Sequence, residues 1–400
     1  MYSSFKPIAM LAIVAGSTQA FAADSVEDAL KASKVSGNFR SYYNTRSYDT
    51  KTDEAALALG GALRVQTGDI GGFKLGLGYY TAQDFGTNSE DLAKVNKRLG
   101  SDLEVLAEGF LTYSAGDTTV TVGRQKINTP FANAGDAFMV PFTYEGTSIV
   151  YKGFSNLTLE ADYINSIKNR NSDEFTEVGD WSANRYGVDT SASESTVILG
   201  GTYAKDSLKV QAWYYDFDDM FTTTYLQANY GFAGNGSTKP FVAFQYGSQS
   251  ATGDELLGDV DSSIVGVQFG AGFGKSKVTF AYNTVAEEEA YKNGAFLAPY
   301  NFSTSPLFTN SMLQNLENGD SGDAMKVTFN HSFPKTKLKL SYAEIDFDTS
   351  TDREAFDFDV TYNLSDYAPG LTFRYRLEIV TSTVASVEQT NQRFQLQYKF

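Results

Sequence analysis

Two arginines near the C-terminus have the type and spacing to bind anions. Arg374 and Arg376 lie in the stretch Leu371-Thr-Phe-Arg-Tyr-Arg-Leu-Glu-Ile379, in which large apolar residues alternate with polar ones. Alternate side chains share one face of a β-strand, so both guanidinium groups would point the same way, about 7 Å apart. A guanidinium group can bind a carboxylate through two parallel hydrogen bonds. The pair therefore indicates a wall that attracts carboxylates.

The same alternation assigns further charged residues to the polar face. The basic candidates are Arg64, Lys74, Lys326, Lys339, Arg374, Arg376, Arg393 and Lys399, and the acidic ones are Asp357, Asp359 and Glu378. An alternative interpretation is that the arginines pair with these acids and only stabilise a polar wall. Both roles can hold, because a field between basic and acidic groups orients dipolar solutes.

The composition excludes several other kinds of chemistry. The chain has no Cys, which excludes disulfides, thiolate catalysis and Cys-ligated metals. Its one His, His331, continues an apolar stripe with Met325, Val327 and Phe329, so we interpret it as an interfacial residue and not as a catalytic base. A formal net charge of −16 argues against a nucleic-acid partner. We therefore predict no enzyme activity, no cofactor and no metal site.

The elements that would position these residues are amphipathic strands. Eighteen stripes of alternating apolar and polar residues are present, at 36–45, 55–67, 72–82, 103–115, 118–125, 144–152, 156–165, 195–204, 207–217, 220–232, 238–247, 262–273, 276–283, 323–332, 336–346, 353–364, 370–382 and 391–400. Most have the length that a tilted strand needs to cross a bilayer.

The connections between the stripes alternate in length. Short turns follow the even stripes, whereas long polar loops follow many odd ones, at 83–102, 126–143, 166–194, 248–261 and 284–322. Transmembrane barrels have short periplasmic turns and long external loops, and a soluble β-sandwich has no reason for this segregation. We predict an all-β fold, a transmembrane antiparallel β-barrel of about eighteen strands.

The two ends of the chain support this assignment. Lys6, a short apolar run and Ala20-Phe-Ala22 are typical of a secretory signal peptide over residues 1–22, which leaves residues 23–400 for the barrel. Phe394, Leu396, Tyr398 and Phe400 form a last amphipathic stripe that ends on an aromatic residue. We expect a protein of the bacterial outer membrane, surrounded by its lipid and inserted by the barrel-assembly machinery.

One segment resembles the third-loop region of the OprD-type substrate-specific porins. It contains Gly123-Arg-Gln125, Asn128-Thr-Pro130, Asp136-Ala-Phe-Met-Val-Pro141 and Thr143-Tyr-Glu-Gly146. The resemblance implies a third loop folded into the lumen as a constriction, carried here by Asn128, Thr129, Pro130, Asp136, Phe138 and Pro141. It also implies a ladder of Arg and Lys that guides carboxylate-bearing solutes. The family often has Arg two residues after the Asp, where this chain has Phe138.

Two functions remain open at this stage. The first is a porin, a passive diffusion channel for small hydrophilic solutes, with carboxylate-bearing solutes as one class. The alternative is a barrel that acts mainly as an adhesin or receptor, whose long external loops bind ions or host partners. The acidic total charge favours cations and the basic ladder favours anions. The sequence is compatible with a monomer or a homotrimer.

Overall fold

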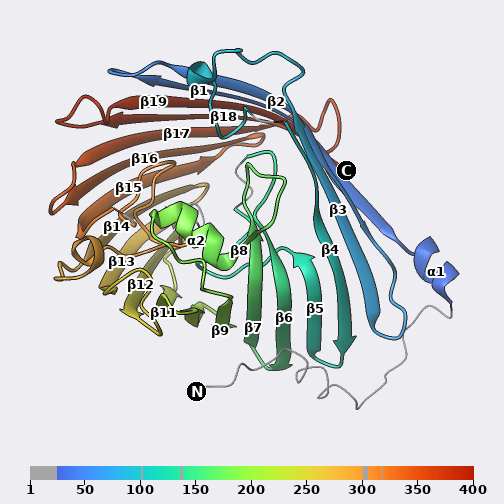
Figure 1. Cartoon of the computed structure of the whole chain (residues 1–400). Helices are drawn as coiled ribbons and strands as arrows, with labels where there is room; N and C mark the ends of the chain where they lie inside the picture. Colours follow the sequence, from blue (N-terminus) through green and yellow to red (C-terminus); the bar gives the residue numbers. More distant parts are fainter. Residues whose placement is uncertain (1–24, 101, 136–137, 301–304, 318) are drawn as a thin grey trace.

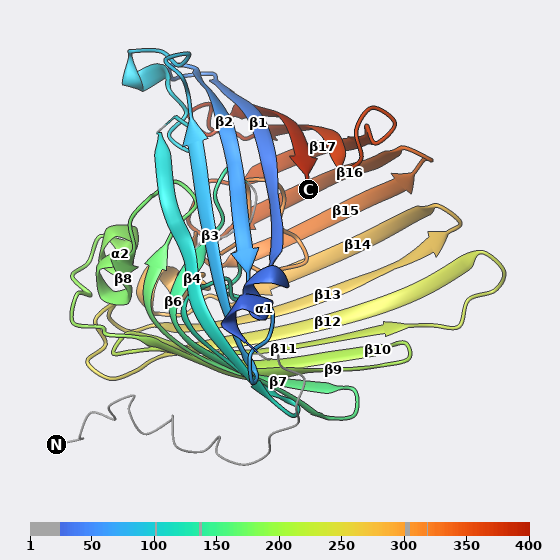
Figure 2. The same cartoon turned by 90° about the vertical axis from the view of Figure 1, so that its right-hand side faces the viewer.

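The computed structural model describes residues 25–100, 102–135, 138–300, 305–317 and 319–400, and it shows a closed antiparallel barrel (Figures 1 and 2). Within these residues the strands are β1 (Lys34–Tyr48), β2 (Glu54–Gln66), β3 (Phe73–Gln83), β4 (Leu103–Ala115), β5 (Thr118–Gln125), β6 (Thr143–Phe154), β7 (Leu157–Lys168), β8 (Thr176–Glu177), β9 (Thr196–Lys205), β10 (Leu208–Phe217), β11 (Phe221–Gly231), β12 (Thr238–Ala251), β13 (Asp261–Phe273), β14 (Ser276–Val285), β15 (Gly322–Ser332), β16 (Thr336–Phe347), β17 (Arg353–Asn363), β18 (Leu371–Thr381) and β19 (Gln389–Lys399). Because β8 is a two-residue strand attached to β7, eighteen strands form the wall.

Every one of the eighteen predicted strands is confirmed, and so is the fold class. Each strand pairs with its sequence neighbour, and β1 pairs with β19 to close the ring. On β18 the alternation predicted from the sequence appears as burial, since Glu378 is fully buried while Ile379 is 38% exposed on the outer face. The largest shift of a single strand end is on β12, which continues four residues past the predicted end to Ala251. These added residues stay in the sheet because the side chain of Gln249 is buried and hydrogen-bonded inside the barrel.

Besides the strands of the wall, the described residues form short helices. They are α1 (Val26–Lys31) and α2 (Val178–Tyr186), with single 3-10 turns at Leu92–Lys94 and Tyr291–Gly294. The side chain of Ser25 caps α1 by accepting a hydrogen bond from the backbone N–H of Asp28. The carbonyl of Ala29 accepts from the backbone of Gly68, so α1 packs beneath the β2–β3 turn. No helix in the described part of the chain is long and apolar enough to cross a membrane. The predicted signal peptide lies outside the described residues.

The last residue takes part in closing the ring. Phe400 and Gly37 exchange backbone hydrogen bonds of 3.1 and 3.0 Å. The ring of Phe400 lies over Gly37, where an added Cβ would approach its Cζ to 2.7 Å, and it packs 5.7 Å from the ring of Phe39. Glycine at position 37 is therefore required for this close approach.

A buried aromatic cluster joins loop residues to strands of the wall. Phe131 lies 5.5 Å from Tyr215 of β10 and 5.3 Å from Tyr225 of β11, both in edge-on contact. Tyr300, from the loop between β14 and β15, packs edge-on against Phe217 of β10. The helix α2 lies in the barrel opening in Figure 1, and its Trp181 donates to the carbonyl of Pro299 at 3.0 Å.

The expectation that the loops at 166–194 and 284–322 are polar and external is wrong for part of each loop, and the loop at 126–143, which the family resemblance predicts to fold inward, joins the same buried cluster. Each of the three contributes residues to the buried cluster, among them Phe142, Val178 and Phe296. The physical reason is that these loops contain large apolar side chains. Burying apolar surface stabilises the folded protein by about 25 cal/mol for each Å² removed from water.

Candidate functional site

The basic wall starts on β18, where Arg374 and Arg376 share the lumenal face with buried Glu378. Arg374 binds Asp359 of β17 through two parallel contacts, Nε to Oδ1 at 2.9 Å and Nη2 to Oδ2 at 2.5 Å. Arg376 reaches the same carboxylate only at 3.4 Å. Arg374 therefore has the wall-stabilising role that the sequence left open. Arg376 is held less closely by Asp359 and keeps N–H donors for a further partner.

Three further arginines gather around the ring of Phe138. Arg393 of β19, directly opposite Arg376 across the strand pair, holds its guanidinium carbon 5.1 Å from the ring centre. Arg170 lies at 4.8 Å and Arg98 at 6.0 Å. Tyr42 of β1 stacks on the same ring, with centres 6.0 Å apart. The ring of Phe138 thus attracts three guanidinium groups by cation–π interaction.

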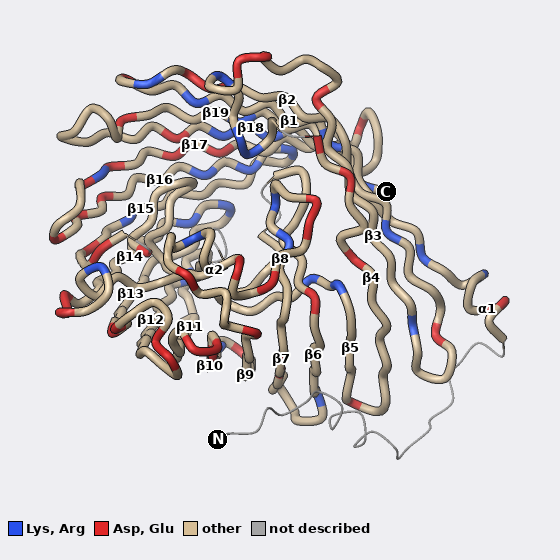
Figure 3. The backbone as a smooth tube through the Cα atoms, viewed as in Figure 1, with Lys and Arg blue, Asp and Glu red and all other residues tan. Residues whose placement is uncertain are grey.

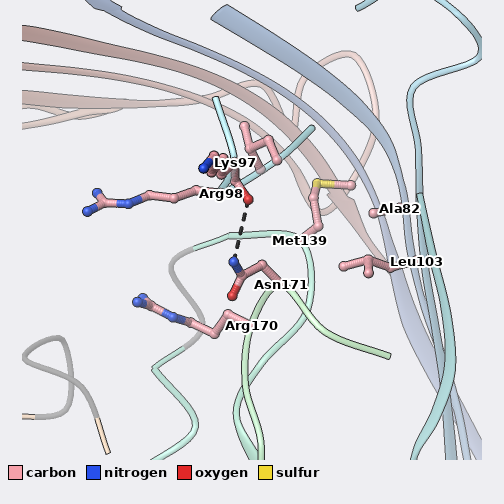
Figure 4. A pocket seen from close by; sticks show the side chains of 8 residues that line it. Ala82, Lys97, Arg98, Leu103, Met139, Arg170 and Asn171 are labelled. Atoms are coloured by element: carbon pink, nitrogen blue, oxygen red, sulfur yellow. Dashed lines mark hydrogen bonds between the residues drawn. The ribbon is translucent and has the colours of Figure 1, made fainter. Parts of the chain in front are cut away.

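Arg98 and Arg170 come from loops and were not predicted. Figure 4 shows both side chains extending in the same direction from two loops that are joined by a 3.4 Å hydrogen bond from Asn171 to the carbonyl of Lys97. Burial, and then repulsion by surrounding cations such as Arg393, lowers the pKa of Arg98 to about 9. The repulsion among these arginines would be relieved by an anion bound between them.

These arginines line a cavity of about 220 Å³. Its basic lining is Arg98, Arg170, Arg376 and Arg393, and the remaining lining residues are Phe138, Ser305, Asn310, Ser311, Met312 and Leu313. The guanidinium groups offer charge and paired donors, while Phe138 and Met312 offer apolar surface. The arrangement suits a small anion with an apolar body.

The segment opposite the arginines is held by two of the three acids predicted to lie in the wall. Glu378 accepts hydrogen bonds from the backbone of Leu313 at 2.7 Å and the hydroxyl of Ser311 at 2.8 Å. Asp357 accepts from the backbone of Met312 at 3.4 Å. Both carboxylates therefore position the loop between β14 and β15. The arginine pairing considered from the sequence is found at Asp359.

The other basic candidates lie outside this cavity. Arg64 binds Glu108 at 2.6 Å, and Lys74 lies 4.0 Å from Asp69 in the β2–β3 turn. Lys326 is buried and donates to the carbonyl of Asn310, so it helps hold the same loop. The last two are half-buried Lys339, directly opposite Asp359 on the neighbouring strand, and exposed Lys399. Figure 3 shows how Lys and Arg recur along β15 to β19.

The predicted third loop contacts strands on different sides of the ring. Phe138 accepts a hydrogen bond from Arg40 of β1 through its carbonyl, and Phe131 donates its backbone N–H to the hydroxyl of Tyr215 of β10 at 3.2 Å. At the start of the loop, between Asn128 and Pro130, Thr129 bonds the carbonyl of Ala132 through both its N–H and its hydroxyl.

The exit of this loop is held by a buried lysine, since Lys168 donates to the carbonyl of Pro141 at 3.0 Å. Asp136 lies outside the described residues. At Phe138, where the family often has Arg, Arg170 and Arg393 supply the cations instead.

Comparisons with known proteins agree with this architecture. The family model described as "outer membrane porin, OprD family" matches residues 107–376. No curated protein matches the chain. Among solved structures, OccK9 (OpdG) of Pseudomonas aeruginosa aligns with a TM-score of 0.78 at 17% identity, covering 93% of this chain and 99% of that one.

Two further channels align as well over nearly their whole length. OccAB3 of Acinetobacter baumannii has a TM-score of 0.77 at 17% identity, covering 92% of this chain and 99% of its own. OpdK of Pseudomonas aeruginosa, solved with vanillate, has a TM-score of 0.77 at 16% identity, covering 93% and 99%. These likenesses show the same barrel fold, and the family model covers more than half of the sequence. The chain belongs to the OprD family of outer membrane porins.

Proposed function

We propose that this outer-membrane diffusion channel passes small solutes that carry a carboxylate, and that the arginine-lined cavity is their binding site. The observation that carries the proposal is the group formed by Arg98, Arg170, Arg376 and Arg393 around one cavity of about 220 Å³. The carboxylates nearby are engaged elsewhere, Asp359 mainly by Arg374 and Glu378 by backbone and hydroxyl donors. The described lining of the cavity contains four arginines and no Asp or Glu, so positive charge is in excess there.

The third loop would form one side of the constriction and residues 305–313 the other. Support for this comes from the contacts of Phe138 with Tyr42 of β1, and of Phe131 with Tyr225 of β11, because these strands are far apart around the ring. The proposal gives the protein a transport role and no catalytic one. The homotrimer stays a prediction, which the mass of the detergent-solubilised protein would test.

The receptor alternative loses its main support. It relied on the length of the loops at 166–194 and 284–322, and these loops place Val178, Phe296 and Tyr300 in the buried cluster. Residues buried in this cluster are not available to an external partner.

Vanillate is a suitable probe, because it combines an aromatic ring with a carboxylate and was found with the similar channel OpdK. The experiment measures vanillate block of the KCl current in planar bilayers for the wild type and for Arg376→Gln/Arg393→Gln. Two charged hydrogen-bonding groups are removed, so the apparent affinity should fall at least about tenfold. The matched control is Lys205→Gln, which removes a positive charge from the exposed end of β9. Equal affinity in wild type and double variant would refute the carboxylate site.

A further inference from the structure

A pair of acidic residues lies on the lumenal face of β7. Leu159 and Tyr163 are each 38% exposed on the outer face, so Glu160 and Asp162 alternate with them and face inward. Asp162 is 3% exposed, and neither of its carboxylate oxygens has a partner at hydrogen-bonding geometry among the described residues. Its directly opposed neighbour on β6 is Ser148. A buried carboxylate is costly unless it is paired or protonated, and a cation bound in front of it would stabilise its charged form.

An indole ring lies beside the pair. Glu160, Gly200 of β9 and Trp213 of β10 occupy directly opposed positions on three neighbouring strands. Trp213 is 6% exposed and leans over Gly200, where an added Cβ would lie 2.4 Å from its Cε3 atom. Because Gly200 has no side chain, the ring occupies the space between its own strand and Glu160.

The acidic pair and the arginine cavity lie on opposite walls. Counting around the ring from β7 through β9 to β17 gives nine steps, half of the eighteen-strand wall. β17 carries Asp359, which binds Arg374, and the neighbouring β18 carries Arg376. The acidic pair is therefore a separate site and not a counter-charge for the arginines.

We propose that Glu160, Asp162 and Trp213 form a lumenal binding site for organic ammonium groups. The two carboxylates supply the charge, with half-buried Glu160 as the contacting group and Asp162 behind it. The face of Trp213 supplies the cation–π surface that ammonium groups prefer among side chains. Within the described residues no cluster of three or more His, Asp or Glu side chains is arranged to hold a metal ion, which fits a ligand bound by charge and aromatic contact.

The site goes beyond the carboxylate-binding cavity and rests only on the channel function. The vanillate experiment on Arg376 and Arg393 and the experiment on the acidic pair use different probes and different residues. Either can therefore fail without the other.

The test uses tetramethylammonium as the probe and the full-length channel in planar bilayers. Added tetramethylammonium should reduce the K⁺ current of the wild type with saturable dependence on concentration. For Glu160→Gln/Asp162→Asn the apparent affinity should fall at least about tenfold, and for Trp213→Leu about threefold to tenfold. Glu160→Gln alone, at a half-buried position, should fall in the same direction and guards against loss of folding in the double variant.

The matched control is Asp206→Asn. Asp206 lies in the exposed turn that joins β9 to β10, with a backbone φ of 52° that Asn accommodates. Like Glu160→Gln, it removes one negative charge, here from the hairpin that carries Gly200 and Trp213. The apparent affinity for tetramethylammonium should equal that of the wild type. The site is refuted if tetramethylammonium blocks the acidic variants with the same apparent affinity as the wild type. It is also refuted if Asp206→Asn lowers that affinity as much as the acidic variants do. Unchanged block in Trp213→Leu would refute the ammonium preference.

Discussion

Replacing Glu378 by Ala should release the segment that faces the arginines and widen the channel. Glu378 is fully buried and accepts two hydrogen bonds, from Leu313 at 2.7 Å and Ser311 at 2.8 Å. A hydrogen bond to a charged group contributes about 1.5–3 kcal/mol, so the two together hold this segment with about 3–6 kcal/mol. Water that enters the vacated space will satisfy part of the freed N–H and hydroxyl, so the lower value applies.

A loss of about 3 kcal/mol changes the ratio of docked to undocked segment by roughly 100-fold. Undocking stays local, because the same loop keeps separate hydrogen bonds from Phe308 to Gln245 and from Thr309 to Asn283. The assay is single-channel conductance in KCl, in which Glu378→Ala should show a larger mean conductance and more open-channel noise than the wild type.

Glu378→Gln is the matched control, because its amide oxygen still accepts a hydrogen bond from Leu313 while the charge is lost. It should lie between the wild type and Glu378→Ala in conductance. The reasoning is refuted if Glu378→Ala conducts like the wild type while the barrel remains folded, as judged by heat-modifiable migration on gels. The segment would then be held in place by its other contacts.

Three further predictions concern other parts of the barrel. Deleting Phe400 removes the contacts with Gly37 and Phe39 and should reduce the amount of assembled, heat-modifiable barrel in outer membranes; unchanged assembly would contradict a role for the terminal aromatic in recognition by the assembly machinery. Deleting residues 133–138 should raise single-channel conductance, because it removes the Phe138 ring on which three arginines pack. An unchanged conductance would show that this loop does not narrow the pore. With a pKa of about 9, Arg98 is charged below that pH and neutral above it. Anion preference, measured as reversal potential, should therefore fall as the pH rises through about 9 in the wild type more than in Arg98→Gln, and parallel curves would refute the assignment.

The sequence predicted the wall of the barrel well because lipid imposes a strict pattern on it. A strand between lipid and lumen must alternate apolar and polar residues, and this period of two is visible without any knowledge of partners. The same pattern placed Arg376 and Arg393 on the lumenal face, where both line the cavity. Parity could not show that Arg374 is bound by Asp359, since this depends on the register between two strands.

The loops were predicted poorly because they follow no such period. Arg98 and Arg170 reach the cavity from irregular backbone, where spacing along the chain does not determine direction. One signal was available in the loop between β14 and β15, where Ala295-Phe-Leu-Ala-Pro-Tyr300 is an apolar run inside a segment interpreted as polar and external. Residues of this kind are rarely left in water, and Phe296 and Tyr300 are indeed fully buried.

This division between wall and loops has a consequence for selectivity. The wall fixes the positions of Arg376, Arg393, Glu160 and Asp162, because a one-residue slip of a strand would turn its apolar face toward the lumen. The loops carry no such constraint, yet they supply half of the arginines in the cavity and all of the segment opposite them. Substitutions in the loops therefore offer a second route to a change of preferred solute, beside exchange of the lumenal strand residues themselves. In the proposed channel, the wall charges would set which solutes approach the cavity, and the loops would set which of them pass.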